Sequence, residues 1–189
     1  EERRRIEALT SLGLSWGLAR LVHEEDAEIA LRIFILDNSG STGTCDGQIL
    51  GMHHGLGRLA MRSCTRWEET VHMAVEQARW NMQVGTPCEF VLLNPWRTGL
   101  PDQDQGYPRI DARAGQGGEE QVARLEEMLK RVRPSGPTPL ADRIDEICRR
   151  VERERAALEE AGQRVVLVIA TDGLPTTAVG GNARDHFVR

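Results

Sequence analysis

One carboxylate and two hydroxyls stand at alternate positions early in the chain, at Asp37, Ser39 and Ser41. They directly follow the apolar run 33–36, and a short apolar run bounded by turn residues predicts a strand buried on both faces, as in a parallel sheet. Ligand sites of such sheets lie at the carboxyl ends of the strands. Oxygen ligands of this kind suit Mg²⁺, Mn²⁺ or Ca²⁺ and not a soft metal. The spacing therefore predicts a cation site at the end of this strand.

A second apolar run of the same kind covers residues 165–170 and is followed by Thr171 and Asp172. If the two strands are neighbours, their carboxylates lie side by side, which makes Asp172 the expected companion of Asp37. Between the two runs, Thr138 stands in a Gly/Pro loop before a helical pattern. Each piece also has a purely structural explanation: the two aspartates can belong to ordinary turns, and the threonine can be a helix cap.

Together, these pieces resemble the metal-ion-dependent adhesion site (MIDAS) of von Willebrand factor type A (vWA) domains. The resemblance rests on Asp37-x-Ser39-x-Ser41, on Thr138 and on Thr171-Asp172-Gly173, which occur in the family's order. It covers roughly residues 30–178, and the segments between the motifs carry much less of it. The resemblance implies an α/β, Rossmann-like three-layer sandwich, with a mostly parallel central sheet and helices on both faces.

For the site itself, the resemblance implies that Ser39, Ser41 and Thr138 bind a cation directly, with Asp37 and Asp172 acting directly or through water. Mg²⁺ is the implied ion, with Mn²⁺ or Ca²⁺ as alternatives, because Mg²⁺ accepts water-rich, near-octahedral sites. A cation held largely by neutral hydroxyls stays electrophilic and keeps an open position. The implied partner is a protein that offers an Asp or Glu side chain, and the implied function is metal-dependent protein binding without catalysis.

Three alternatives compete with this interpretation. A strand ending in Asp37 also resembles haloacid-dehalogenase-like phosphatases, whose nucleophile is that Asp, but those enzymes carry Asp-x-Asp and Ser39 takes the third position here. A serine hydrolase needs Gly-x-Ser-x-Gly, and residues 40–43 are one residue short of it. A vWA module of a larger ATP-driven complex is the third alternative. The chain has no Gly-x-x-x-x-Gly-Lys-Ser/Thr loop, so any nucleotide chemistry would lie elsewhere.

Length and composition fit one soluble domain. The chain has 189 residues, 40% of them apolar and 28% charged, which is ample for a single core. Its net charge of −5, from 24 basic and 29 acidic residues, gives no electrostatic reason to expect nucleic acid or a membrane surface as partner. No apolar run approaches the roughly 18 residues of a membrane span. We expect a soluble protein and favour the cytoplasm, while the oligomeric state stays open.

Other candidate ligands are poorer. The four cysteines form no Cys-x-x-Cys pair, so we expect free thiols and no zinc site. His53 and His54 are adjacent and have no carboxylate nearby in sequence, so we expect them to be surface residues. Asp102 and Asp104 lack the glycine and closing glutamate of a helix-loop-helix calcium loop, and we do not expect them to form a second cation site.

Apolar periodicity and capping residues predict the remaining elements. We expect an amphipathic helix within residues 11–26, capped by Ser15, with Trp16 as a packing residue. Its apolar residues at helical spacing are Leu14, Leu18, Leu21 and Val22. A capping box at Thr65 predicts a helix over 66–83. Further expected elements are a loop or short strand within 45–63, a strand at 89–94, an edge strand within 107–113, a helix at 119–132 and a long helix that starts at Thr138-Pro139 and ends before Gly162.

We treat the chain as one vWA-like domain, 1–189, with its core at about 30–178 and a charged lead-in at 1–14. Domains of this family normally continue with a helix, at least one more strand and a closing helix. The closing strand and helix are therefore expected to be missing after residue 189. A C-terminal truncation of this kind predicts a floppy C-terminus.

Overall fold

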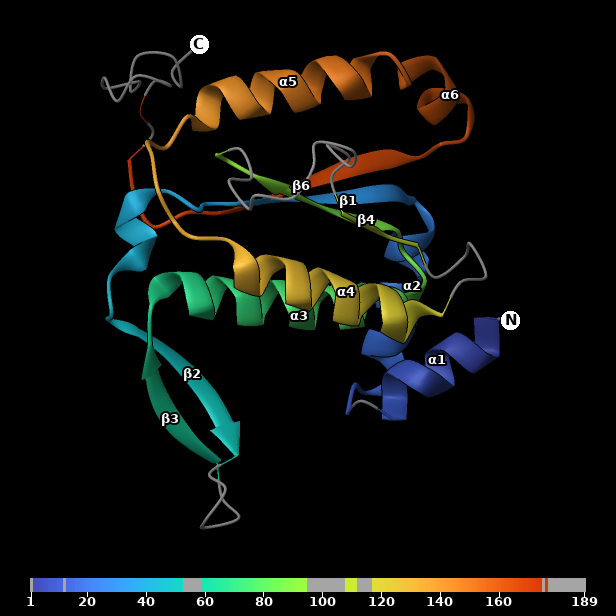
Figure 1. Cartoon of the computed structure of the whole chain (residues 1–189). Coiled ribbons are helices and arrows are strands. Elements are labelled where there is room, and N and C mark those ends of the chain that lie inside the picture. The colour runs from blue at the N-terminus through green and yellow to red at the C-terminus, as the bar shows by residue number, and fades with distance from the viewer. Residues whose placement is uncertain are drawn as a thin grey trace.

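The computed structural model of the chain describes residues 2–11, 13–52, 59–94, 108–111, 117–174 and 176. Its helices are α1 (Glu2–Ser11), α2 (Trp16–Ala27), α3 (Arg66–Val84), α4 (Gly118–Arg131), α5 (Leu140–Glu152) and α6 (Arg155–Glu160), with the 3-10 turn η1 (Gly40–Gly43). Its strands are β1 (Ile29–Leu36), β2 (Gly47–Met52), β3 (Leu59–Cys64), β4 (Cys88–Leu92), β5 (Arg109–Ile110) and β6 (Arg164–Ala170). The described chain is a mixed α/β protein (Figure 1).

A four-stranded, mostly parallel sheet in the order β5-β4-β1-β6 runs through the middle of the fold (Figure 1). The central strand β1 is parallel to β4 and to β6, and β5 pairs antiparallel with β4 at one edge. Leu36 lies opposite Leu92 of β4 and Ala170 of β6. The three parallel strands therefore end level with one another, and the residues that follow them meet at one edge of the sheet.

Helices cover both faces of this sheet, with α3 and α4 on one side and α5 on the other (Figure 1). Successive side chains of a strand point to opposite faces. Phe34 and Leu36 of β1 belong to the core under α3 and α4, whereas Ile33 and Ile35 belong to the core under α5. Burial on both faces explains the continuous apolar run. Phe34 also stacks on Phe90 of β4, with ring centroids 5.0 Å apart.

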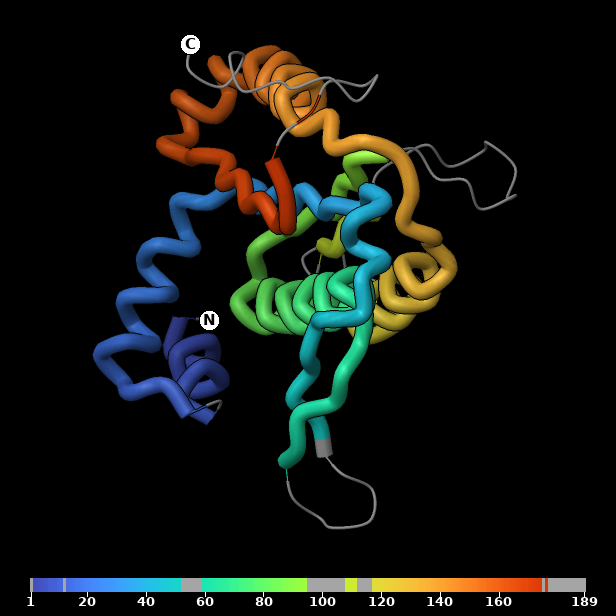
Figure 2. Tube along the Cα trace, turned by 90° about the vertical axis from the view of Figure 1, so that its left-hand side faces the viewer, coloured from blue at the N-terminus to red at the C-terminus, as the bar shows by residue number. Residues whose placement is uncertain are grey.

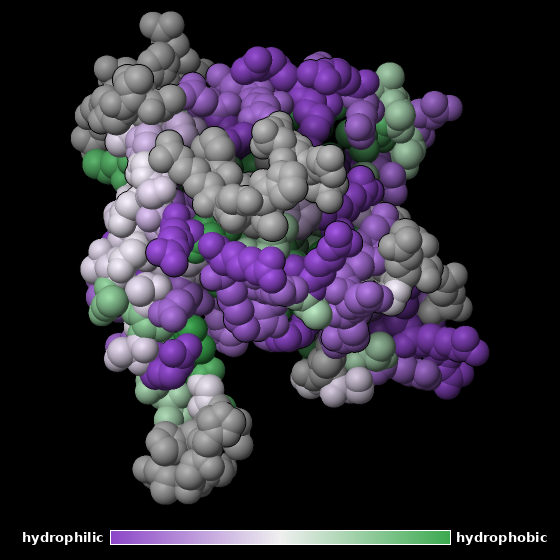
Figure 3. Space-filling view, viewed as in Figure 1, coloured by the Kyte–Doolittle hydropathy of each residue, from purple (hydrophilic) through white to green (hydrophobic). Residues whose placement is uncertain are grey.

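Where a loop or short strand was expected within 45–63, β2 and β3 form an antiparallel hairpin that projects from the body of the molecule (Figures 1 and 2). Leu50 pairs with Met61, and these side chains are 54% and 58% exposed. Hydrophobic residues thus lie along the hairpin, whereas the outward sides of α4 and α5 are hydrophilic (Figure 3). The connecting residues 53–58, with His53 and His54, lie outside the described residues.

The N-terminal lead-in is a helix that packs against the domain. α1 buries Ile6 and Leu9, which form a small core with Ala19 of α2 and Val84 of α3. Charged residues of α1 occupy its outer side, as in Arg3, which donates to Glu7. Most of the charge of this segment therefore lies on its exposed face, whereas Arg5 is partly buried against Gly85.

In α2, the cap was predicted correctly and the apolar face only in part. The hydroxyl of Ser15 accepts a hydrogen bond from the N–H of Leu18, as expected. Leu14 and Val22 are partly buried and pack inward as expected. Trp16 is 54% exposed, and Leu18 and Leu21 are about half exposed, so the prediction that these three pack inward is wrong. The small Ala19 makes the close contact with α1 instead, and this orientation turns the larger side chains outward.

Most other elements agree with the sequence pattern. The capping box of α3 is present, with Thr65 accepting from the N–H of Glu68, and β5 provides the expected edge strand. The long helix predicted after Thr138 is wrong in two respects: it is divided into α5 and α6, and it starts at Leu140, where no side chain caps it. The cap explanation for Thr138 is therefore excluded.

Three further points concern the chain as a whole. All four cysteines are free, and burial raises the pKa of the Cys88 thiol to about 12. None of the described helices combines the length and the apolar character needed to cross a bilayer. The predictions for Asp102, for Asp104 and for a floppy end over residues 177–189 lie outside the described part of the chain.

Candidate metal centre

The turn after β1 is built by hydrogen bonds to its own side chains. Asp37 is 1% exposed, and its Oδ1 accepts a hydrogen bond of 2.9 Å from the backbone N–H of Ser39. The hydroxyl of Thr42 in η1 donates to the carbonyl of Ser39 over 2.8 Å. This arrangement, typical of Asp and Ser in turns, leaves Ser39 Oγ 3.1 Å from Ser41 Oγ.

β6 brings a second carboxylate to the same place. The backbone N–H of Asp37 donates to the carbonyl of Ala170, the last residue of β6, over 3.0 Å. The Thr171 hydroxyl then donates to Asp37 Oδ2 over 2.7 Å. Ser41 Oγ donates to Asp172 Oδ1 over 2.9 Å. Pairing of β1 with β6 thus places the ends of the two predicted motifs in direct contact.

The loop before α5 lies against the first turn. The N–H of Gly40 donates to the carbonyl of Gly136, and the N–H of Ser135 donates to the carbonyl of Asn38, over 3.1 and 2.9 Å. Asn38 also joins this turn to the end of β4, because its Oδ1 accepts from the N–H of Asn94 over 2.8 Å. The ends of β1 and β4 and the loop before α5 are therefore held as one unit.

Thr138 lies in this loop but is not connected to the other four predicted ligands by its hydroxyl. Its side chain is buried, and its backbone N–H and carbonyl pair with Thr176 over 2.8 and 2.9 Å. Among the described residues, no hydrogen bond links the Thr138 hydroxyl to Asp37, Ser39, Ser41 or Asp172. The structure therefore joins four of the five predicted residues directly, whereas the fifth lies in the loop whose Gly136 pairs with Gly40.

We expect Gly136→Ala to destabilise the protein by about 1–3 kcal/mol more than Gly162→Ala does. Both glycines have positive φ, +89° and +61°, where a side chain is strained by roughly 1–2 kcal/mol. Only at Gly136 would the new Cβ meet a neighbour, Asn94 Oδ1 at 2.9 Å; at Gly162 it meets nothing within 4 Å. Urea unfolding measures the free energy of unfolding of both variants. Equal losses of stability would show that the Asn94 side chain moves aside at no cost.

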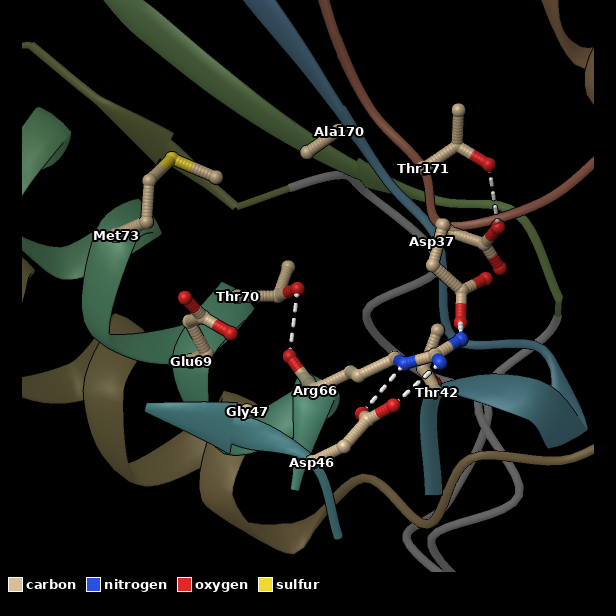
Figure 4. Close-up of a pocket in the computed structure, with 11 residues that line it drawn as sticks. Asp37, Thr42, Asp46, Gly47, Arg66, Glu69, Thr70, Met73, Ala170 and Thr171 are labelled. Carbon is tan, nitrogen blue, oxygen red and sulfur yellow. Dashed lines mark hydrogen bonds and ion pairs between the residues drawn. The ribbon is translucent and has the colours of Figure 1, made fainter. Parts of the chain in front are cut away.

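A positive charge supplied by the protein lies beside the two motifs. Arg66, the first residue of α3, donates from Nη1 to Asp172 Oδ2 over 2.7 Å. Its Nε and Nη2 donate to the two carboxylate oxygens of Asp46, over 2.7 and 2.6 Å (Figure 4). The bond to Asp46, followed by the bond to Asp172, raises the pKa of Arg66, and the same Arg66–Asp46 bond lowers the pKa of Asp46.

These groups line an open pocket of about 480 Å³ at the carboxyl edge of the sheet (Figure 4). Asp37, Thr171 and Asp172 line it at the strand ends, next to Arg66 of α3 and to Asp46, which directly precedes β2. Sequence reasoning missed Arg66 and Asp46. The two residues are 20 positions apart, and Arg66 lies 106 positions from Asp172, so no local pattern connects them.

The donor atoms fit a small, hard cation. Among the described residues, no group of three or more His, Cys, Asp and Glu side chains could hold a metal, which leaves the two carboxylates and the hydroxyls. Mg²⁺ binds oxygen at about 2.0–2.1 Å in an octahedron, so neighbouring ligands lie about 2.9–3.0 Å apart. The separations of Ser39 Oγ from Ser41 Oγ and of Ser41 Oγ from Asp172 Oδ1, 3.1 and 2.9 Å, are close to this spacing.

No protein-family model, curated protein or solved structure matches the chain.

Proposed function

We propose that the chain is a vWA-like domain that binds an acidic residue of a partner protein through a divalent cation at a MIDAS-type site. The observation that carries this proposal is the spacing of the oxygens of Ser39, Ser41 and Asp172, which suits one octahedral ion. The sheet with helices on both faces supports the matching fold, a Rossmann-like three-layer sandwich.

Within this proposal, Ser39 and Ser41 would hold the ion through their hydroxyls, and Asp37 and Asp172 would hold it directly or through water. Thr138 would contribute its hydroxyl from the adjoining loop, where it serves no capping role. A bound Mg²⁺ would supply a double positive charge, which the carboxylates of Asp37 and Asp172 would balance. The hydroxyls would add neutral ligands and leave one coordination position open. An open position on such an ion accepts a carboxylate, the preferred ligand class of Mg²⁺.

Binding is favoured over phosphoryl transfer by the surroundings of Asp37. In the haloacid-dehalogenase-like alternative, its carboxylate would attack phosphorus. The position of the usual second Asp is taken by Ser39, whose hydroxyl contacts Ser41. This arrangement offers no carboxylic acid at that position to protonate a leaving group.

The proposal predicts binding of a capped Gly-Glu-Gly peptide in Mg²⁺ and no binding of capped Gly-Gln-Gly. NMR titration should move the amide signals of residues 39–41 with the Glu peptide only, and EDTA should abolish the shifts. Ser39→Ala should weaken binding on the order of tenfold, as loss of a metal ligand or its immediate support does. Ser63→Ala, on the exposed side of β3, is the matched control and should bind normally.

Equal shifts with the Gln peptide, or shifts that survive EDTA, would contradict the proposed function. Turnover of a phosphoester that is lost in Asp37→Asn would instead establish the phosphatase alternative. Both experiments use the same protein preparations, so the two functions are separated directly.

A further inference from the structure

We propose that Arg66 tunes the site toward a cation that carries an acidic ligand. Its charge weakens binding of the bare cation and strengthens binding of a carboxylate to the loaded site. This inference rests on the proposed function and assigns a selective role to a residue outside the predicted ligand set. The partner chemistry that it favours is an anionic side chain over a neutral one.

The carboxylate of Asp172 lies between Arg66 and the Ser41 hydroxyl, which would hold the ion. Asp172 accepts from Arg66 at Oδ2 and from Ser41 at Oδ1. The Asp172 side chain is 15% exposed and that of Arg66 is 35% exposed, so solvent screens the pair less than a surface pair. A divalent ion bound at Ser41 would therefore experience both the attraction of Asp172 and the repulsion of Arg66.

The position of the guanidinium is fixed on several sides. Asp46 receives two parallel hydrogen bonds from it, the geometry that orients an arginine most firmly. The backbone N–H of Arg66 donates to the carbonyl of Thr44, the residue after η1, over 3.0 Å. Arg66 also starts α3, where the helix dipole disfavours a cation. The two carboxylates offset this unfavourable placement, so the guanidinium stays beside the site.

The charges of the cluster match this role. The charged residues that line the pocket are Asp37, Asp46, Glu69 and Asp172 with Arg66, which leaves three negative charges in excess. With a divalent cation bound, a partner carboxylate would approach a cluster with one excess negative charge. Without Arg66 the loaded cluster would keep two negative charges and repel that carboxylate more strongly. Glu69 of α3 accepts a hydrogen bond from the N–H of Gln48 on β2 over 3.4 Å.

The test measures two affinities in each variant: that of Mn²⁺ alone, from the electron paramagnetic resonance signal of the free ion, and that of acetate for the Mn²⁺-loaded protein. We expect Arg66→Gln to bind Mn²⁺ on the order of tenfold more tightly and acetate several-fold more weakly, from Coulomb interactions at this range. Arg66→Lys, which keeps the charge, should restore both affinities most of the way. Arg79→Gln removes the same charge from α3 where it pairs with Glu126 of α4, outside the residues that line the pocket, and should change neither.

A purely structural role of Arg66 predicts that both affinities fall together in Arg66→Gln and that Arg66→Lys does not restore them. That result, or unchanged Mn²⁺ affinity in Arg66→Gln, would overturn the inference while leaving metal binding itself intact. Absence of Mn²⁺ binding in every variant would overturn the proposed function as well. Circular dichroism of each variant ensures that folded proteins are compared.

Discussion

Mg²⁺ at about 100 times its dissociation constant is expected to raise the free energy of unfolding by about 2.7 kcal/mol, and Asp37→Ala is expected to abolish this increase. The proposed ion would bind the folded chain only, because Ser41 and Asp172 are 131 residues apart in sequence and meet through strand pairing. Thermal or urea unfolding with Mg²⁺ and with EDTA gives the increase for each protein.

The comparison must use the metal-dependent difference within each variant. Asp37 is buried and accepts two hydrogen bonds, so Asp37→Ala also lowers stability without any metal. Asp37→Asn keeps the shape of the side chain and removes its charge, with an NH2 donor in place of one of the two accepting oxygens. Asp145→Ala removes one exposed carboxylate from α5 and should keep the full increase. An Mg²⁺ effect of equal size in wild type and in Asp37→Ala would place the ion elsewhere.

Phe90→Ala is expected to lower the free energy of unfolding by about 3–5 kcal/mol. Phe90 is 1% exposed, lies on β4 opposite Phe34 of β1 and stacks on its ring at an interplanar angle of 13°. Truncation therefore removes buried apolar area, leaves a cavity between sheet and helices, and loses the stacking contact. Urea unfolding by circular dichroism measures the change.

Leu50→Ala on the hairpin is the matched control, because its side chain is 54% exposed. A surface substitution of this kind should change stability by about 0.5 kcal/mol or less. Phe90→Leu should fall between the two, since it refills much of the volume. If Phe90→Ala cost less than about 1 kcal/mol, the sheet core would not be packed as described.

Local sequence patterns predicted the parts of the fold that depend on local chemistry. Continuous apolar runs predicted β1 and β4, because strands covered on both faces need apolar residues at every position. The run over 165–170 also predicted β6, but its expected burial on both faces is wrong: β6 is an edge strand that is only partly buried, with Ile169 41% exposed. The Thr65 capping box predicted the start of α3, since a cap satisfies backbone groups within four residues. The turn at Asp37 was also predictable, because its hydrogen bonds join neighbouring residues.

Features that depend on distant residues were not predictable in this way. The hairpin was hidden by glycines at positions 47 and 51, which normally interrupt strands, and by apolar residues that remain exposed. The outward placement of Trp16 depends on how α2 packs on α1. The contacts of Arg66 with Asp46 and Asp172 join three separate segments. The break between α5 and α6 falls in a charged run without glycine or proline.

The pairing of β1 with β6 has a kinetic consequence. These strands are separated by more than a hundred residues, and contacts of such long range form slowly because a large loop must close first. The hairpin and the helices can form before this step, whereas the two halves of the site meet only after it. An ion that needs both halves would therefore leave the folding rate nearly unchanged and slow the unfolding rate. Its main effect would be a longer lifetime of the folded chain wherever unfolding limits proteolysis.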